Sequence, residues 1–225
     1  MSDLLKYINI HTHNDISDQD KISVINIFPD KCSQINDNSL QYYSIGIHPK
    51  YIDEQTYIFE LQIIEKMSSC KSVIAIGETG IDRLGLISTD LQIDIFKKHI
   101  SIANKFKKPL IIHCVKAHNE IMSILKKTKN CVPVIFHGFN QKAEIASEIL
   151  KQGYYISIGH SVFNSNSNAF ILIRNIDLSK IFFENDDKDF SIEEIYKYVS
   201  EIKNISIENI KESIFQNFCK VFKNE

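Results

Sequence analysis

Residues 73–82 of the chain read Val-Ile-Ala-Ile-Gly-Glu-Thr-Gly-Ile-Asp, and residues 110–114 read Leu-Ile-Ile-His-Cys. Each stretch begins with a short, largely β-branched apolar run, which is typical of a strand in a parallel sheet covered on both faces. Between them, residues 91–106 carry apolar side chains at three- and four-residue spacing, which predicts an amphipathic helix. Thr89 and Gln92 predict a capping box at its start. The whole stretch therefore indicates one β-α-β unit with a right-handed crossover.

The same alternation extends along the rest of the chain. Six further apolar runs predict strands, namely Tyr7–Ile10, Ile22–Phe28, Tyr42–Ile47, Val132–Phe136, Tyr154–Ile158 and Ile181–Phe183. Further helices are predicted over Tyr57–Met67, Ala117–Leu125, Ala143–Leu150 and Ile207–Phe222, and another is opened by Ser191 and Glu194. Eight strands alternating with helices favour an α/β fold, a compact TIM-type (β/α)8 barrel that forms a single domain over residues 1–225. The alternative is an open doubly wound sheet. The connection Pro29–Gln41 is too polar for a full helix, so one unit is expected to be irregular.

Composition excludes several classes of protein. The chain has 225 residues, of which 44% are hydrophobic and 24% charged, so it is not a disordered chain. No apolar run approaches the roughly 20 residues that a membrane span needs. The net charge of −2 argues against a protein that grips nucleic acid over its whole surface, although a local basic patch stays open. Five cysteines without a CxxC spacing, and no signal peptide at residues 1–10, favour a cytoplasmic protein with reduced thiols.

Histidines and acids gather at the ends of the predicted strands. They are His11, His13, His48, Glu78, His113, His137, His160, Glu184 and Asp186. In a barrel the strand ends share one rim, where active sites are built, and the two imidazoles of an HxH pair on a strand point to one face. Nitrogen and carboxylate ligands suit Zn, Mn, Fe, Co or Ni, and with enough carboxylate and water also Mg. Four of these histidines, His11, His13, His113 and His137, together with the carboxylates of Glu78 and Asp186, are more ligands than one tetrahedral ion needs. This number predicts a two-metal site with Glu78 as the bridge. The remaining histidines, His99 and His118, are expected on helix surfaces.

Taken together, these motifs resemble the TatD-type metal-dependent hydrolases of the amidohydrolase superfamily. The matching segments are Ile10–His13, Gly46–Pro49, Ile76–Asp82, Pro109–Cys114, His137–Phe139 and Glu184–Asp186. The resemblance implies a TIM barrel with one or two divalent ions of Mg, Mn or Zn. One ion would bind His11, His13, Glu78 and Asp186, and the other would bind Glu78, His113 and His137.

The resemblance also implies an activity, which is 3′→5′ exonuclease cleavage of single-stranded DNA. Asp186 and Glu78 are the expected catalytic residues, with Asp186 orienting or deprotonating the water that attacks the phosphodiester. Glu184 is expected to steady a histidine ligand. DNA is the expected partner, with no membrane and no obligate protein partner.

Three side chains near the predicted mouth are candidates for substrate binding. His48 either contacts a phosphate or stabilises the turn with Pro49. Arg83 either binds a phosphate or pairs with Asp82. Lys116 either replaces, as a point charge, an arginine that many family members carry at the position of Val115, or is a solvated lysine at a helix start.

Other departures from the family concern the substrate more than the metal chemistry. Asn185 stands where the family commonly has threonine, and Asp187-Lys188-Asp189 replaces a Ser-Pro-like continuation. The predicted mouth also lacks the arginines and stacked aromatic rings that single-strand binders usually offer. The alternative function is therefore a metal-dependent hydrolase of a small phosphoester, amide or lactone, without nucleic-acid activity. A non-enzymatic binding or scaffold protein is the third hypothesis, and the intact ligand set argues against it.

Overall fold

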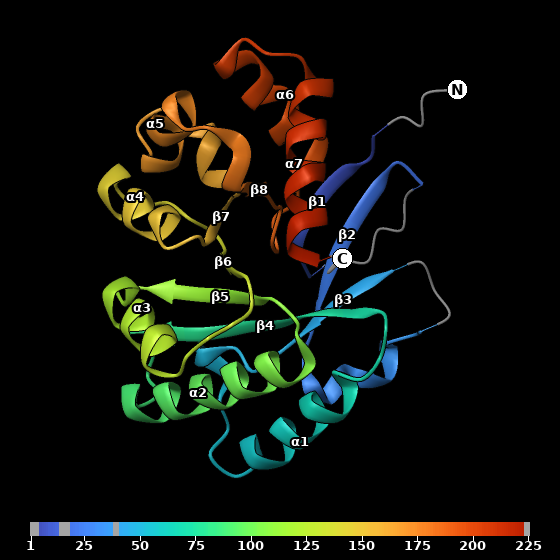
Figure 1. Ribbon diagram of the computed structural model, residues 1–225, viewed down its shortest axis with the longest axis vertical. Helices are drawn as coiled ribbons and strands as arrows, with labels where there is room; N and C mark the ends of the chain where they lie inside the picture. Colours follow the sequence, from blue (N-terminus) through green and yellow to red (C-terminus); the bar gives the residue numbers. More distant parts are fainter. Residues whose placement is uncertain (1–4, 14–18, 38–40, 223–225) are drawn as a thin grey trace. The chain divides into compact units, whose positions relative to one another are not determined.

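A computed structural model describes residues 5–13, 19–37 and 41–222 of the chain (Figure 1). The strands are β1 (Tyr7–Thr12), β2 (Lys21–Ile27), β3 (Tyr42–Ile45), β4 (Val73–Asp82), β5 (Leu110–Val115), β6 (Val134–Phe136), β7 (Tyr155–Ile158) and β8 (Ile181–Phe183). The α-helices are α1 (Tyr57–Met67), α2 (Thr89–Phe106), α3 (His118–Lys127), α4 (Ala143–Lys151), α5 (Asn168–Asn175), α6 (Ile192–Lys203) and α7 (Ile207–Phe222). The described residues also form short 3₁₀ helices, which are η1 (Pro29–Gln34), η2 (Pro49–Tyr51), η3 (His160–Phe163) and η4 (Leu178–Lys180).

The strand order is sequential, from β1 through β8. In addition, β1 lies beside β8, because Thr12 and Asp186 form a parallel bridge. This is the topology of a (β/α)8 barrel, so the predicted fold class is confirmed and the open doubly wound alternative is wrong. Among the helices of the described residues, none has the length and apolar character that a bilayer crossing requires.

The chain divides into two compact units, one of residues 25–136 and one of residues 1–24 with 137–225. In the first unit, β3 to β6 pair in parallel in chain order, with Ile76 opposite Leu110. Helix α2 packs on β4 and buries Phe96 completely, which contributes about 1.5–3 kcal/mol by removing the ring from water. Gly80 is needed where β4 meets β5, because its φ is +147° and a Cβ there would collide with the carbonyl oxygen of His113.

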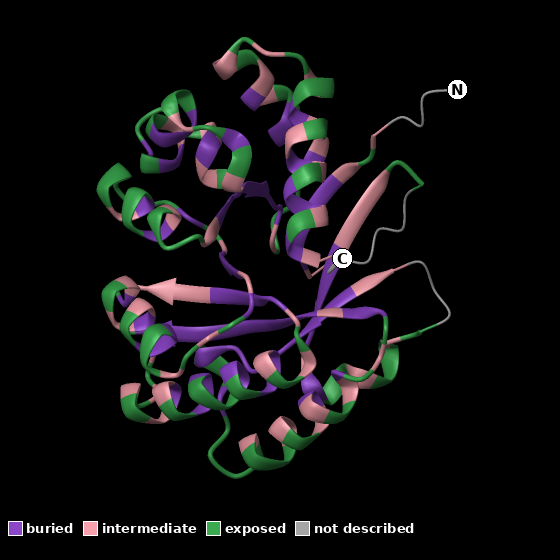
Figure 2. Ribbon diagram, viewed as in Figure 1, coloured by how far each residue is buried: buried purple, intermediate pink, exposed green. Residues whose placement is uncertain are grey.

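In the second unit, β7 pairs with β8, and α6 and α7 pack against β1 and β8. Tyr196 of α6 is fully buried, and its hydroxyl donates to the carbonyl oxygen of Ile8 and accepts from the Ile8 amide, both at 3.1 Å. Figure 2 shows buried strands and helices that bury one face each. This pattern is what the apolar spacing of the sequence predicts.

Most predicted elements form within a few residues of the predicted bounds, and α1, α7 and β8 match them. One predicted strand differs, and one helix is additional. Strand β4 does not end at Glu78 but continues to Asp82, because Gly77 and Gly80 let this polar stretch lie against β5. Helix α5 was not predicted, since it is only 8 residues long. The connection after β2 is irregular as expected, with η1 in place of an α-helix.

The predicted capping box at the start of α2 is wrong. Ser88 occupies the N-cap, and no side chain caps the helix there. Gln92 is instead fully buried, and its amide accepts from the Asp82 amide at 2.8 Å and donates to the carbonyl oxygens of Asp82 and Ile87. A buried amide binds such partners because leaving them unmade costs free energy. Gln92 therefore holds the end of β4.

The predicted surface position of His99 and His118 is also wrong. His99 is fully buried on α2, where Nε2 accepts from the Ile47 amide at 3.0 Å and Nδ1–H donates to the carbonyl oxygen of Ile95 at 2.9 Å. His118 is half-buried and stacks on Phe136. Helical spacing identifies the buried face of a helix but does not show that a polar side chain on it has a partner.

Candidate functional site

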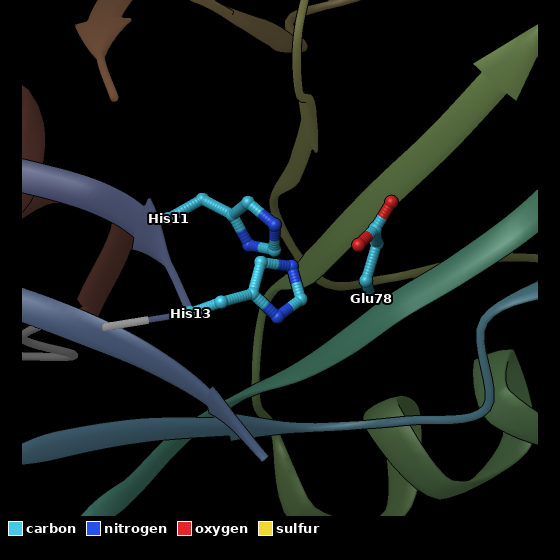
Figure 3. Close-up of side chains that lie close together, drawn as sticks. All are labelled: His11, His13 and Glu78. Carbon is cyan, nitrogen blue, oxygen red and sulfur yellow. The ribbon is translucent and has the colours of Figure 1, made fainter. Parts of the chain in front are cut away.

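His11 and His13 lie side by side at the end of β1, with ring centroids 5.1 Å apart (Figure 3). Asp186 follows β8, and its backbone is joined to β1 on both sides. Its amide donates to the carbonyl oxygen of His11 at 3.1 Å, and the His13 amide donates to its carbonyl oxygen at 3.2 Å. The pairing of the first and last strands therefore brings both histidines to one carboxylate.

The geometry of this cluster suits a metal ion. Nε2 of His11 lies 3.5 Å and Nε2 of His13 lies 3.4 Å from the same oxygen, Oδ1 of Asp186. Ligand atoms bound at about 2.1 Å in a tetrahedral site are about 3.4 Å from one another. The ring of His137 lies 4.5 Å from that of His11. Two imidazoles and a carboxylate thus offer nitrogen and oxygen ligands at ligand-to-ligand distances, and a third imidazole lies beside them.

The same histidines control the charge of Asp186. Burial would raise the pKa of this carboxyl, but hydrogen bonds from His11 and His13 and the positive charges of His11 and His137 lower it well below its usual range. The lowered pKa favours the carboxylate form of Asp186, which is the form that binds a metal.

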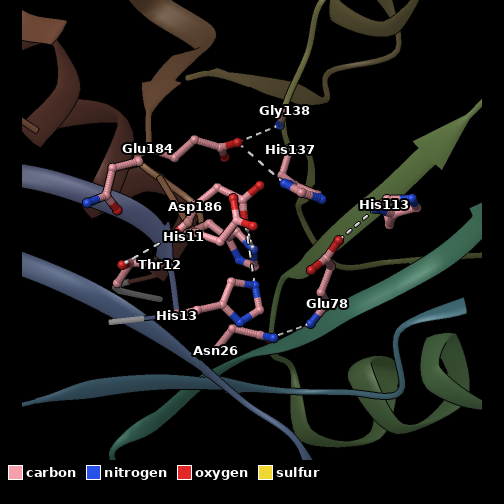
Figure 4. A network of polar contacts seen from close by, with 12 residues as sticks. His11, Thr12, His13, Asn26, Glu78, His113, His137, Gly138, Glu184 and Asp186 are labelled. Carbon is pink, nitrogen blue, oxygen red and sulfur yellow. Dashed lines mark hydrogen bonds and ion pairs between the residues drawn. The ribbon is translucent and has the colours of Figure 1, made fainter. Parts of the chain in front are cut away.

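Glu184 lies next to His137 and is almost completely buried. It accepts hydrogen bonds from the Gly138 amide at 2.7 Å and from the Ser157 hydroxyl, and its Oε1 lies 3.4 Å from Nδ1 of His137 (Figure 4). These contacts hold the His137 ring at Nδ1, which leaves Nε2 as the nitrogen for a metal.

A second cluster lies in the unit of residues 25–136, at β3, β4 and β5. Oε1 of Glu78 is 2.7 Å from Nδ1 of His113 and 3.2 Å from Nε2 of His48, and these two nitrogens are 3.2 Å apart. These three atoms lie within 4.8 Å of one another, which is close enough to surround one ion. Glu78 is buried, and its amide donates to Oδ1 of Asn26 at 2.7 Å. Figure 4 shows Asn26 beside Glu78 and His113 opposite it.

His48 is held in one protonation pattern by the turn that follows it. The Lys50 amide donates to Nδ1 of His48 at 3.0 Å, so Nδ1 is an acceptor. A neutral His48 therefore carries its hydrogen on Nε2 and donates towards Glu78. Of the two roles weighed for this residue, the structure shows the turn contact, and the contact with a phosphate stays a prediction.

Asp82 is a site residue that sequence reasoning did not single out. It is buried, and its Oδ2 lies 3.1 Å from Nε2 of His113 and 3.2 Å from Nζ of Lys50. Burial raises the pKa of this carboxyl, but the hydrogen bonds from His113, the Leu84 amide and Lys50 outweigh it and lower the pKa. The available signal was the spacing of Glu78 and Asp82, since residues i and i+4 of a strand line one face.

The other two substrate-binding candidates, Arg83 and Lys116, have different surroundings in the structure. Arg83 pairs with Glu120, with Nη2 and Nε at 2.8 Å and 3.2 Å from one oxygen, so the proposed pairing of Arg83 with Asp82 is wrong. The carboxylate of Asp82 pairs with Lys50 and His113 instead. Lys116 is exposed directly after β5, with a left-handed φ of 54°.

Comparisons with known proteins agree with these motifs. The family model described as "TatD related DNase" matches residues 17–223. An uncharacterized metal-dependent hydrolase of Buchnera aphidicola subsp. Baizongia pistaciae is 29% identical, over 98% of this chain and 92% of the relative. Another uncharacterized metal-dependent hydrolase, from Buchnera aphidicola subsp. Acyrthosiphon pisum, is 30% identical, over 80% of this chain and 76% of the relative.

Solved structures show the same fold at lower identity. YJJV, a TatD homolog from Escherichia coli, matches with a TM-score of 0.82 at 16% identity, over 99% of this chain and 100% of that one. A hydrolase of the TatD family from Entamoeba histolytica matches with a TM-score of 0.79 at 17% identity, over 96% of this chain and 98% of that one.

Proposed function

This chain belongs to the family of TatD-related DNases, and on that premise we propose that residues 1–225 act as a single-domain deoxyribonuclease that removes nucleotides from the 3′ end of single-stranded DNA. The two relatives from Buchnera aphidicola are named metal-dependent hydrolases, which supports metal-dependent hydrolysis as the general activity. The finer assignment to DNA is supported by the family description and by the ligand clusters. A cytoplasmic location is part of the proposal, and the five free cysteines support it.

The observation that carries the proposal is the position of two histidine nitrogens at 3.4 and 3.5 Å from one carboxylate oxygen. We assign His11, His13 and Asp186 to one ion. The second ion would take His113 and His137, with Glu78 bridging the two ions. This joint assignment follows from the barrel topology, in which strand ends share one rim, and from the family resemblance. Mg, Mn or Zn suits such nitrogen and oxygen donors.

Bound divalent ions would supply a nucleophile by lowering the pKa of water, and would offset charge on the phosphoryl oxygens. The protein's own groups do the rest. Asp186, a carboxylate at neutral pH, orients the attacking water or accepts its proton. When substrate is bound, the Nε2–H of His48 donates to a phosphoryl oxygen in place of Glu78, since its Nδ1 already accepts from the backbone. Glu184 and Asp82 position His137 and His113.

Metal analysis and a cleavage assay test the proposal together. The purified protein is titrated with Mn²⁺ and Zn²⁺ by calorimetry, and cleavage of a 5′-labelled single-stranded oligonucleotide is followed with each metal. We expect His11→Ala to lose metal binding and cleavage. The matched control is His118→Ala, which removes a half-buried histidine on α3.

Each outcome has a defined meaning. Absence of metal binding in the wild-type protein would refute the assignment. Cleavage that is unchanged by His11→Ala would mean that this site does not perform it. Metal binding without oligonucleotide cleavage, together with turnover of a small phosphoester, amide or lactone, would replace the nuclease by the alternative hydrolase. Cleavage that starts from the 5′ end would leave the chemistry intact and change the polarity.

A further inference from the structure

A cluster of aromatic rings lies beside the Asp186 end of β8. His160 and Phe163 come from η3, and Phe190 follows β8. The ring centroid of Phe190 is 5.5 Å from that of His160 and 5.6 Å from that of Phe163. Tyr198 of α6 lies behind Phe163 at 5.1 Å. These rings come from separate segments of the chain, and they meet at tilted or edge-on angles.

The aromatic rings remain accessible although they contact one another. His160 is exposed, whereas Phe163 and Phe190 are half-buried. The tilt between the rings of His160 and Phe190 is 46°, and Phe163 meets Phe190 edge-on at 87°. Contacts of this kind fix the position of a ring without covering it completely. A fixed, partly exposed ring offers a flat apolar surface to a planar ligand.

Two contacts join these rings to the acidic residues of the metal cluster. Asn185, which directly precedes Asp186, donates from Nδ2 to the carbonyl oxygen of Phe190 at 3.2 Å. Gly159, which directly precedes His160, lies so close to Glu184 that a Cβ would be 3.3 Å from its Cγ. The aromatic cluster is therefore built onto the backbone that carries the proposed catalytic carboxylate.

Phe190 also lines a cavity of about 340 Å³ in the same unit. The lining includes Thr12, which stands between His11 and His13, and also Asn185 and Lys188. Its volume is within the range of roughly 300–1,000 Å³ of small-ligand pockets. The cavity thus combines the Phe190 ring, an amide and the Lys188 ammonium group, which pairs with Asp187 at 2.9 Å, and Asp189 and Glu194 also line it.

We propose that His160 and Phe190 form a stacking site for an unpaired nucleobase of the substrate, and that Lys188 binds a neighbouring phosphate. The inference rests on the proposed nuclease function and adds the means by which a single strand is recognised. Base stacking on aromatic side chains suits single strands of any sequence, since every base has a π-face. In a duplex the faces are covered by neighbouring bases, so such a site favours unpaired ends.

Binding without metal tests the stacking site separately from catalysis. In EDTA, fluorescence anisotropy compares a labelled single-stranded oligonucleotide with an abasic strand that has the same number of phosphates. The wild-type protein should bind the base-bearing strand more tightly. Phe190→Ala should weaken that binding about 5- to 150-fold and leave the abasic strand unaffected. Phe170→Leu, on α5, is the matched control and should change neither.

A tryptophan variant distinguishes loss of the stacking site from misfolding of the protein. The chain has no tryptophan, so Phe190→Trp introduces a single reporter at the site. It should keep the affinity of the wild-type protein, and its emission should be quenched by the base-bearing strand and not by the abasic one. Lys188→Ala should weaken both strands equally, because an ammonium group contacts the phosphate and not the base.

The outcomes separate this inference from the proposed function. Equal wild-type affinity for the two strands, or equal loss on both with Phe190→Ala, would overturn the stacking site. Metal-dependent cleavage of either strand would still support the nuclease. Discrimination between the strands without any metal-dependent cleavage would overturn the nuclease and leave the stacking site standing.

Discussion

His99 is a buried, neutral imidazole on α2 that holds the Ile47 amide, directly before His48. Burial lowers the pKa of His99 from 6.5 to about 4, although the hydrogen bond to the Ile95 carbonyl opposes this. In the unfolded chain the imidazole keeps a pKa of about 6.5. As pH falls, the unfolded state therefore binds a proton that the folded state does not. The contribution of His99 to stability is complete above pH 6.5 and is lost as pH falls towards 4.

The difference of 2.5 pKa units between 6.5 and 4 sets the size of the effect. Each unit corresponds to about 1.4 kcal/mol, so lowering the pH from 7.5 to 5.0 should cost about 2 kcal/mol at this residue. The variant His99→Gln keeps an acceptor and a donor but does not titrate. Its stability should therefore fall less over this pH range than that of the wild-type protein, by about 2 kcal/mol.

Urea unfolding followed by circular dichroism at both pH values measures this difference. EDTA in both samples removes the pH dependence of metal binding. Burial also lowers the pKa of His118, but this residue is present in both proteins, so its contribution cancels in the difference between them. The exposed His160 provides the control His160→Gln, which should retain the wild-type loss. If His99→Gln loses as much stability as the wild-type protein, the assignment of a neutral buried His99 is refuted.

Three further predictions concern the site and its frame. Glu184→Gln should weaken Mn²⁺ or Zn²⁺ binding about 10- to 100-fold in calorimetry, because the contact that orients His137 is weakened; unchanged affinity would exclude that role. Gly80→Ala should destabilise the protein by more than about 2 kcal/mol in urea unfolding. Gly153→Ala is the control, since Gly153 has a φ of +87° but open space around it, and it should cost about 1–2 kcal/mol. Equal costs would contradict the close approach of β4 to β5. Arg83→Gln should change thermal stability by less than about 1 kcal/mol, because its ion pair is at the surface, and a larger loss would indicate a further role.

The sequence by itself determined the fold class and nearly all of the elements. Short β-branched runs and helical spacing are local signals, and each appears in a few consecutive residues. Ser191 and Glu194 are one such signal, because the helix that they were expected to open forms as α6, where the structure shows that the two residues make a capping box. The sequence also showed that histidines and acids stand at the strand ends, because the strands of a barrel follow one another in chain order.

The tertiary structure alone decided which side chains meet. His99 carries no sequence mark that separates a buried imidazole from a surface one, and Gln92 has the pattern of a cap but holds β4. The pairing of Arg83 with Glu120, and of Asp82 with His113, depends on how neighbouring strand-helix connections turn. Such contacts join residues tens of positions apart, and their free energies depend on burial and distance, which no local pattern encodes. The ring cluster of His160, Phe163 and Phe190 arises in the same way, from two loops that packing alone brings together.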